Sequence, residues 1–204
     1  MFIPKEFEFK DREEIIAFIR RYSFGVIVTT VDDVPVATHL PFHILIRDEK
    51  IVLTAHMAKA NRQWKGIEEK PVLVIFSQPH AYISPTHYEN PQSVPTWNYI
   101  AVHTTGKCTL VSDADKGMEI LEQMILQSEP DYKQQWDGLS QEYRVNMYQG
   151  IVPFEIEVTD IKAAAKLSQN KTESERQQII TTLAQSKEST ENDIADFMKK
   201  GCPY

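Results

Sequence analysis

Hydrophobic and polar residues alternate in two ways along this chain of 204 residues, and each way predicts a different kind of element. Alternation with a period of two predicts strands. In the segment 151–159, Phe154 and Ile156 fall on one face, whereas Glu155 and Glu157 fall on the other, which is typical of a half-exposed strand. Similar short runs predict further strands at 25–30, 34–42, 51–55, 72–77, 97–105 and 105–112. The apolar residues 44–46 are expected to continue the strand before them.

Apolar residues spaced three and four apart predict helices between and around these strands. Asp11 is a predicted N-cap, and an apolar stripe follows it as far as Arg20 or Arg21. A second helix begins after Asp113 and is interrupted at Pro130. Further helices are predicted at 141–148, 173–185 and 188–200. Short strands in hairpin order with scattered helices favour an antiparallel barrel of six or seven strands, a mainly β fold with helices (α+β).

The segment His56–Lys65 departs from the strand pattern, and it predicts a short helix that begins just beyond a strand end. The N-terminus of such a helix would offer free backbone amides to an anion, with Lys59 and Arg62 on one side of it. The alternative is a solvated linker helix that Trp64 anchors to the core. The sequence leaves both readings open.

Charge and composition restrict the classes of partner. The net charge is −7, and between Asp113 and Arg144 eight acidic residues stand against three basic ones, a local balance of −5. Nucleic-acid affinity depends mainly on basic side chains that neutralise phosphates, so direct DNA binding is disfavoured.

Cys108 and Cys202 suggest no disulfide framework. No apolar run is long enough to cross a bilayer, and the first residues lack the layout of a secretion signal. We therefore expect a cytoplasmic protein that does not bind membranes.

The motif search excludes several kinds of site. All six histidines fall between Thr38 and Thr104, but none of them forms a ligand pair with metal-binding spacing on a predicted element, so no metal site is expected. His39 and His43 are four residues apart, yet they lie on a predicted strand and its end. The chain has no glycine-rich phosphate loop and no nucleophile elbow. Whether the chain is an enzyme stays open.

The stretch from Val94 to Gly106 carries the clearest candidate for a binding surface. Thr96, Trp97, Asn98 and Tyr99 open a predicted strand, so Trp97 and Tyr99 share one face and Thr96 and Asn98 share the other. Two large rings beside a hydroxyl and an amide suit the wall of a pocket for a planar ligand. The alternative is a buried aromatic anchor next to a turn that Thr96 and Asn98 stabilise.

Four segments in this order and spacing resemble the PaiB-type family of FMN-binding negative transcriptional regulators, which is related to the pyridoxamine-phosphate-oxidase-like split barrels. They are Thr38-His39-Leu40-Pro41, His56-Met57-Ala58-Lys59-Ala60-Asn61, Pro95-Thr96-Trp97-Asn98-Tyr99 and Lys166-Leu167-Ser168-Gln169-Asn170. The resemblance implies a six-stranded split β-barrel over residues 1–170 with a helical insert at about 113–148, and a helical extension of the same domain over 171–204. It also implies a homodimer that holds FMN at the subunit boundary.

The resemblance further implies which residues contact the cofactor. His56, Lys59 and Asn61 would hold the phosphate and the ribityl oxygens, and Thr38 and His39 would lie along the strand beneath the flavin. Trp97 and Tyr99 would flank the ring, while Thr96 and Asn98 would reach its polar edge. Lys166, Ser168 and Gln169 would close the site. All four segments would then converge on one flat phosphorylated ring.

The chain departs from the family pattern at two places. A Gly-Lys pair is common before Lys-Leu-Ser-Gln-Asn, but Ala163, Ala164 and Ala165 stand before Lys166 here. A Trp is common where this chain has His87. Both departures predict a weaker affinity for FMN, so the purified protein could lack it.

Three functions remain open at this level. The resemblance implies a regulator of the sporulation and protease-synthesis type, acting through DNA, a regulatory protein or a metabolite rather than through a dedicated DNA-binding motif. The second is a flavin-dependent oxidoreductase that acts on an unknown small molecule. The third is a haem-binding split barrel with a histidine as axial ligand.

Overall fold

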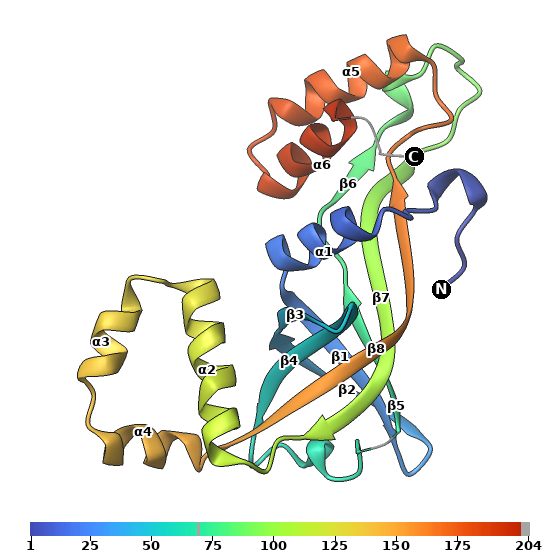
Figure 1. Cartoon of the computed structure of the whole chain (residues 1–204). Helices are drawn as coiled ribbons and strands as arrows, with labels where there is room; N and C mark the ends of the chain where they lie inside the picture. Colours follow the sequence, from blue (N-terminus) through green and yellow to red (C-terminus); the bar gives the residue numbers. More distant parts are fainter. Residues whose placement is uncertain (69, 201–204) are drawn as a thin grey trace. The chain divides into compact units, whose positions relative to one another are not determined.

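The computed structural model describes residues 1–68 and 70–200, and Cys202 lies outside them. In these residues the strands are β1 (Phe24–Val31), β2 (Val34–Pro41), β3 (His43–Arg47), β4 (Lys50–Ala58), β5 (Pro71–Phe76), β6 (His80–Ile83), β7 (Thr96–Leu110) and β8 (Ile151–Lys166). The α-helices are α1 (Arg12–Arg21), α2 (Ala114–Ser128), α3 (Tyr132–Gly138), α4 (Gln141–Tyr148), α5 (Glu173–Ala184) and α6 (Ser189–Lys199), and the 3-10 helices are η1 (Lys5–Phe7), η2 (Arg62–Trp64) and η3 (Pro85–His87) (Figure 1). Among the helices of the described residues, none combines the length and the apolar character that spanning a bilayer requires.

The chain divides into two compact units. Unit 1 consists of Met1–Tyr22, Phe76–His103 and Lys162–Tyr204, and unit 2 consists of Ser23–Ile75 and Thr104–Ile161. The long strands β7 and β8 each begin in one unit and end in the other. The division into a domain of residues 1–170 and an extension of 171–204 stays a prediction.

The strands form one sheet in the order β2-β1-β5-β7-β8-β4-β3, and β6 pairs with β7. The pairs β1–β2, β1–β5, β3–β4, β4–β8 and β6–β7 are antiparallel. Within unit 2, β2 at one end of this order also contacts β4 near the other end, so the sheet of unit 2 curves back on itself. The predicted α+β fold with an antiparallel sheet is confirmed.

The sheet has eight strands in the described residues, so the predicted number of six is wrong. One additional strand is β3, which does not continue β2 as expected. Two acidic turn residues, Asp48 and Glu49, have φ of 49° and 63°. Both values lie in the left-handed region that two-residue hairpin turns require. This turn folds β3 onto β4, and the other additional strand, β6, pairs with the first residues of β7.

The predicted helix at His56–Lys65 is also wrong. His56, Met57 and Ala58 extend β4, where they pair with the first residues of β8. The amide of Lys59 donates to the Gly150 carbonyl at 2.8 Å, and only the three residues of η2 are helical. A predicted helix N-terminus with free amides is therefore absent from this described segment, because pairing with β8 outweighs the local composition.

Unit 1 is built around α1, α5 and α6. The Asp11 side chain caps α1 as predicted, accepting the Glu14 amide at 3.0 Å. The buried face of α1 includes Phe18, whose ring lies 6.4 Å from that of Phe197 on α6. The Tyr22 hydroxyl donates to Asp193 at 2.9 Å. These contacts pack α1 against α6 within unit 1.

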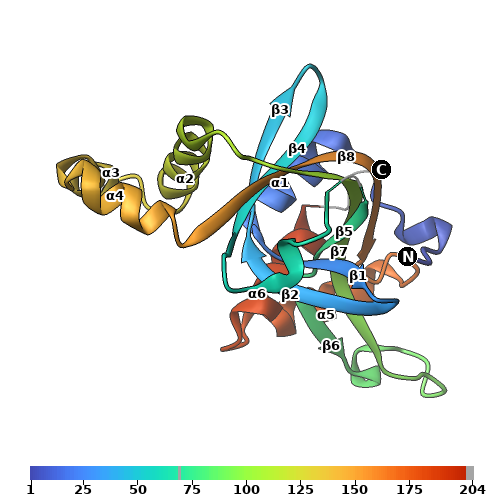
Figure 2. The same ribbon diagram turned by 90° about the horizontal axis from the view of Figure 1, so that it is seen from below.

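The helical insert of unit 2 comprises α2, α3 and α4, which follow one another between β7 and β8. In both views α2 lies between the strands of unit 2 and α3 (Figures 1 and 2). The sequence predicted α4 with its bounds but missed α3. Trp136 is the one buried residue of α3, so this helix has no repeating apolar pattern.

Candidate functional site

The hairpin of β6 and β7 in unit 1 exposes an aromatic surface. Tyr82 stands opposite Trp97 and His80 opposite Tyr99 in its register. The Trp97 and Tyr82 side chains are 52% and 46% exposed, and their ring centroids lie 5.7 Å apart. The His80 ring lies 5.8 Å from that of Trp97. Trp97 and Tyr99 share this face as predicted, and the surface offers a planar ligand rings to stack on.

Lys166, at the end of β8, supplies a cation in the same unit. Its ammonium donates a hydrogen bond to the Thr96 hydroxyl and lies 5.8 Å from the centre of the Phe7 ring. Burial lowers the pKa of Lys166. Within the described residues, no carboxylate lies at ion-pair distance from this ammonium. A half-buried ammonium without an anionic partner can accept a phosphate or carbonyl oxygen.

Asn98 and Ser168 are buried behind this surface, with 0% and 3% exposure. The Asn98 amide nitrogen donates to the Ser168 hydroxyl at 3.0 Å. The Ser168 hydroxyl lies 3.1 Å from the Asn98 amide oxygen, to which it can donate. Ser168 has a φ of 58°, a strained value for a residue with a side chain. The Gln169 oxygen accepts the Leu167 amide at 2.7 Å. These bonds fix the turn that follows Lys166.

In unit 2, the structure brings Thr38 and Asn61 together through a residue that the sequence analysis missed. The Asn61 amide donates to the Thr38 hydroxyl at 2.9 Å, and that hydroxyl donates to the Gln63 oxygen. Gln63 is 3% exposed, and its amide nitrogen donates to the Thr29 hydroxyl at 3.0 Å and to the Val36 carbonyl at 3.1 Å. The sequence offered no local signal for Gln63, because its partners lie on the distant strands β1 and β2.

The other predicted contacts of unit 2 have different surroundings. Lys59 is exposed, and its carbonyl accepts the Trp64 indole N–H at 3.0 Å. His39 is exposed on β2, and its ring is stacked 6.2 Å from that of Phe24. His56 is half-buried on β4 and lines a hollow beneath the helical insert. Burial lowers the pKa of His56, which disfavours the charged form of its ring.

The predicted cofactor contacts thus fall into two clusters, one in each unit. The cluster of unit 1 comprises Thr96, Trp97, Asn98, Tyr99, Lys166, Ser168 and Gln169, and the cluster of unit 2 comprises Thr38, His39, His56, Lys59 and Asn61. Within unit 1, the exposed Trp97 ring and the Lys166 ammonium, which has no carboxylate partner in the described residues, fit a flat, anionic ligand such as FMN. As individual contacts, these residues stay a prediction.

Two solved structures resemble the chain in fold. The flavocytochrome Anf3 from Azotobacter vinelandii has a TM-score of 0.60 and 16% identity, over 76% of this chain and 67% of that protein. The FAD and heme binding protein from Mycobacterium smegmatis has a TM-score of 0.60 and 13% identity, over 76% of this chain and 71% of that protein. At such identities the likeness establishes the fold alone.

Comparison of sequences gives a stronger similarity, to one family. A family model described as "Putative FMN-binding domain" matches residues 1–160. The protease synthase and sporulation protein PAI 2 of Bacillus subtilis (strain 168) is 40% identical over 202 residues, which cover 98% of this chain and 97% of that protein. The chain therefore belongs to the PaiB-type family of FMN-binding proteins, as its four sequence segments predicted.

Proposed function

We propose that this chain binds FMN and acts as a negative regulator of transcription, of the sporulation and protease-synthesis type. The observation that carries the flavin-binding part of the proposal is the half-buried Lys166 ammonium, which bonds to Thr96 next to the exposed Trp97 ring and has no carboxylate partner in the described residues. Membership of an FMN-binding family supports the cofactor, and the name of the Bacillus subtilis relative supports the role.

The residues of unit 1 would bind and orient the flavin. Lys166 would donate to an oxygen of the cofactor, with Thr96 as a second polar contact. The rings of Trp97 and Tyr99 would supply the stacking area. Because Asn98 and Ser168 bond to each other in the buried layer, we assign them and Gln169 as positioning residues that hold the turn after Lys166. When bound, the flavin would supply the redox-active ring.

The residues of unit 2 would add polar contacts for the phosphate and the ribityl chain. Lys59 is the exposed cation of this cluster, and Thr38 and Asn61 are held in place by Gln63. We also propose that the protein is a homodimer in the cytoplasm. In support of a dimer, the large apolar side chain of Phe24 is exposed beside the His39 ring.

The regulator would not bind DNA strongly by itself. The net charge of −7 and the lack of a Lys/Arg cluster in the sequence disfavour phosphate binding. A regulatory protein or a metabolite would then couple the flavin protein to transcription. A gel-shift titration tests this point: complexes that form at low salt and vanish near physiological salt support it, and a sequence-specific complex that persists there contradicts it.

A flavin-dependent oxidoreductase is the alternative function, because the ring of a bound flavin can carry redox chemistry. Adding NADH or NADPH to the FMN complex without oxygen separates the two functions. Rapid bleaching of the flavin absorbance supports the enzyme. A persistent absorbance supports the regulator.

A pair of lysines on β8 tests the proposed flavin site. Lys166→Gln should raise the dissociation constant for FMN by about ten- to a hundredfold, because a charged hydrogen bond to a ligand is worth roughly 1.5–3 kcal/mol. The matched control is Lys162→Gln, which changes an exposed lysine of the same strand and should leave the affinity unchanged. Fluorescence titration with FMN measures both. Equal affinities of the two variants would contradict the role of Lys166.

A further inference from the structure

Residues 1–10 form an N-terminal arm that pairs with the last part of β8. The Phe9 amide donates to the Ala163 carbonyl at 2.9 Å, and Glu8 forms an antiparallel bridge with Ala164. Both alanines lie on β8 shortly before Lys166, and all these residues belong to unit 1. The arm is therefore joined to the sheet just before the residue that carries the candidate cation.

Two buried phenylalanines fasten this arm to unit 1. Phe7 and Phe9 are 8% and 6% exposed. Phe7 is the last residue of η1, and its amide donates to the Pro4 carbonyl at 2.9 Å. Burial of two aromatic side chains stabilises a short segment more than one or two backbone hydrogen bonds do. The Phe7 ring therefore has a fixed place in unit 1.

The Lys166 ammonium lies over the Phe7 ring. Its nitrogen is 5.8 Å from the ring centre, within the distance of about 6 Å over which an aromatic face attracts a cation. The Thr96 hydroxyl accepts a hydrogen bond from the same ammonium, which has three N–H groups to donate. The ring and the hydroxyl together hold this half-buried ammonium beside the first residue of β7.

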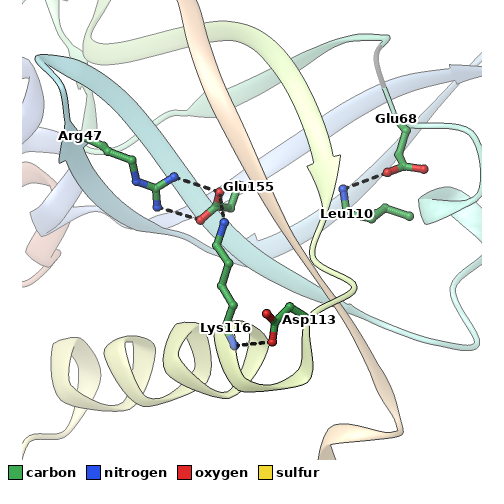
Figure 3. Close-up of polar contacts among 6 residues, drawn as sticks. All are labelled: Arg47, Glu68, Leu110, Asp113, Lys116 and Glu155. Carbon is green, nitrogen blue, oxygen red and sulfur yellow. Dashed lines mark hydrogen bonds and ion pairs between the residues drawn. The ribbon is translucent and has the colours of Figure 1, made fainter.

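An aromatic ring holds a cation without neutralising it, whereas a carboxylate cancels its charge. Figure 3 shows the second case in unit 2, where the Lys116 ammonium donates to Glu155 at 2.9 Å. An ammonium in such a pair has little charge left for an anionic ligand. On the arm, Glu8 pairs with Lys10 at 2.9 Å, and among the described residues no carboxylate pairs with Lys166. The charge of Lys166 therefore stays available to a ligand oxygen.

We propose that Phe7 is a positioning residue of the flavin site, whose ring directs the Lys166 ammonium toward Thr96 and leaves its charge available to an oxygen of the cofactor. The inference rests on the proposed binding of FMN and adds the N-terminal arm to that site. It gives the arm a function besides packing, because the cation is held in place only while the arm is paired with β8.

A double-mutant cycle on FMN affinity tests this inference. Phe7→Leu keeps a large apolar side chain but removes the ring, and it should raise the dissociation constant for FMN about two- to tenfold, the range of one cation–π contact. In the Lys166→Gln background the same substitution should cause no further loss, because the ammonium that the ring directs is gone. Equal losses in both backgrounds would overturn the inference, since Phe7 would then act through packing alone.

The matched control is Phe9→Leu. Phe9 is the other buried ring of the arm, and within residues 1–68 and 70–200 no cation lies over it. Phe9→Leu should lower the melting temperature, as Phe7→Leu does, but it should leave the affinity for FMN unchanged. A loss of affinity as large as that of Phe7→Leu would contradict a specific role of the Phe7 ring.

A titration of Lys166 in the protein without cofactor tests the contact itself. NMR of labelled lysine side chains measures the pKa of this ammonium, and Lys166→Gln identifies its signal. Pentafluorophenylalanine in place of Phe7 nearly keeps the shape of the ring but reverses the charge on its face, which also guards against misfolding of the leucine variant. The pKa of Lys166, which burial already lowers, should then fall further. An unchanged titration would overturn the inference.

The two measurements separate this inference from the proposed function. Failure of the unmodified protein to bind FMN contradicts the proposed function and removes the inference with it. Normal binding of FMN together with an unchanged Lys166 titration overturns the role of Phe7 alone. Normal binding, a lowered pKa of Lys166 in the fluorinated protein and a loss of affinity that depends on Lys166 support both.

Discussion

Gln63 is expected to be the most sensitive polar position of unit 2. The substitution Gln63→Met keeps the length of the side chain but removes the amide. Its nitrogen bonds to the Thr29 hydroxyl at 3.0 Å and to the Val36 carbonyl at 3.1 Å, and its oxygen accepts from Thr38. Thr29 is 7% exposed, so water cannot easily replace the lost partner.

The expected loss follows from the groups left unpaired. A buried polar group that loses its partner costs about 1–3 kcal/mol, so the bonds lost at the Thr29 hydroxyl and the Val36 carbonyl predict a loss of about 3 kcal/mol in the free energy of unfolding. For a chain of this size that corresponds to a fall in Tm of about 6–12 °C. Thermal unfolding followed by circular dichroism measures it. The control is Gln178→Met, on the exposed face of α5, which should stay within about 0.5 kcal/mol. If Gln63→Met and Gln178→Met unfold at the same temperature, the hydrogen bonds of Gln63 do not stabilise unit 2.

Two further substitutions test the packing and the charges of unit 2. Gly106→Ala should lower the free energy of unfolding by about 3 kcal/mol or prevent folding, because its Cβ would lie 2.3 Å from the Glu157 carbonyl oxygen. The control is Gly138→Ala, because Gly138 has open space around it. Equal melting temperatures of the two variants would refute the reasoning. Arg47 holds the pKa of Glu155 below its ordinary value of 4.5, so this carboxylate stabilises the fold above the unfolded pKa, and the stabilisation is lost as pH falls through the folded pKa. Glu155→Gln should therefore cost about 1 kcal/mol at pH 7, and the cost should shrink as the pH falls through the lowered pKa of Glu155. A difference in Tm that grows on acidification would contradict this.

Local patterns predicted the elements whose stabilisation is local. Asp11 caps α1 as predicted because the bond to the Glu14 amide is made within the first turn. The alternation around Phe154 and Glu155 gave a strand because one face of β8 is buried in unit 2. The exposed face shared by Trp97 and Tyr99 followed from the period of a strand.

Tertiary pairing decided the elements that were missed. His56 lies in β4 because its backbone pairs with Pro153, nearly a hundred positions later in the sequence, and no pattern within ten residues reports such a partner. Gln63 was missed for the same reason, since it bonds to β1 and β2. The segment of α3 contains one buried ring, Trp136, so its apolar residues show no helical period.

The titration of the purified protein with FMN tests the central claim most directly. We expect quenching of the flavin fluorescence that saturates at one FMN per chain, with a dissociation constant raised by the alanines before Lys166 but still measurable in the micromolar range. We also expect the Lys166→Gln variant to need more cofactor for the same quenching. Flavin fluorescence that stays unchanged up to high micromolar FMN would contradict the claim that this chain is a flavin-binding protein.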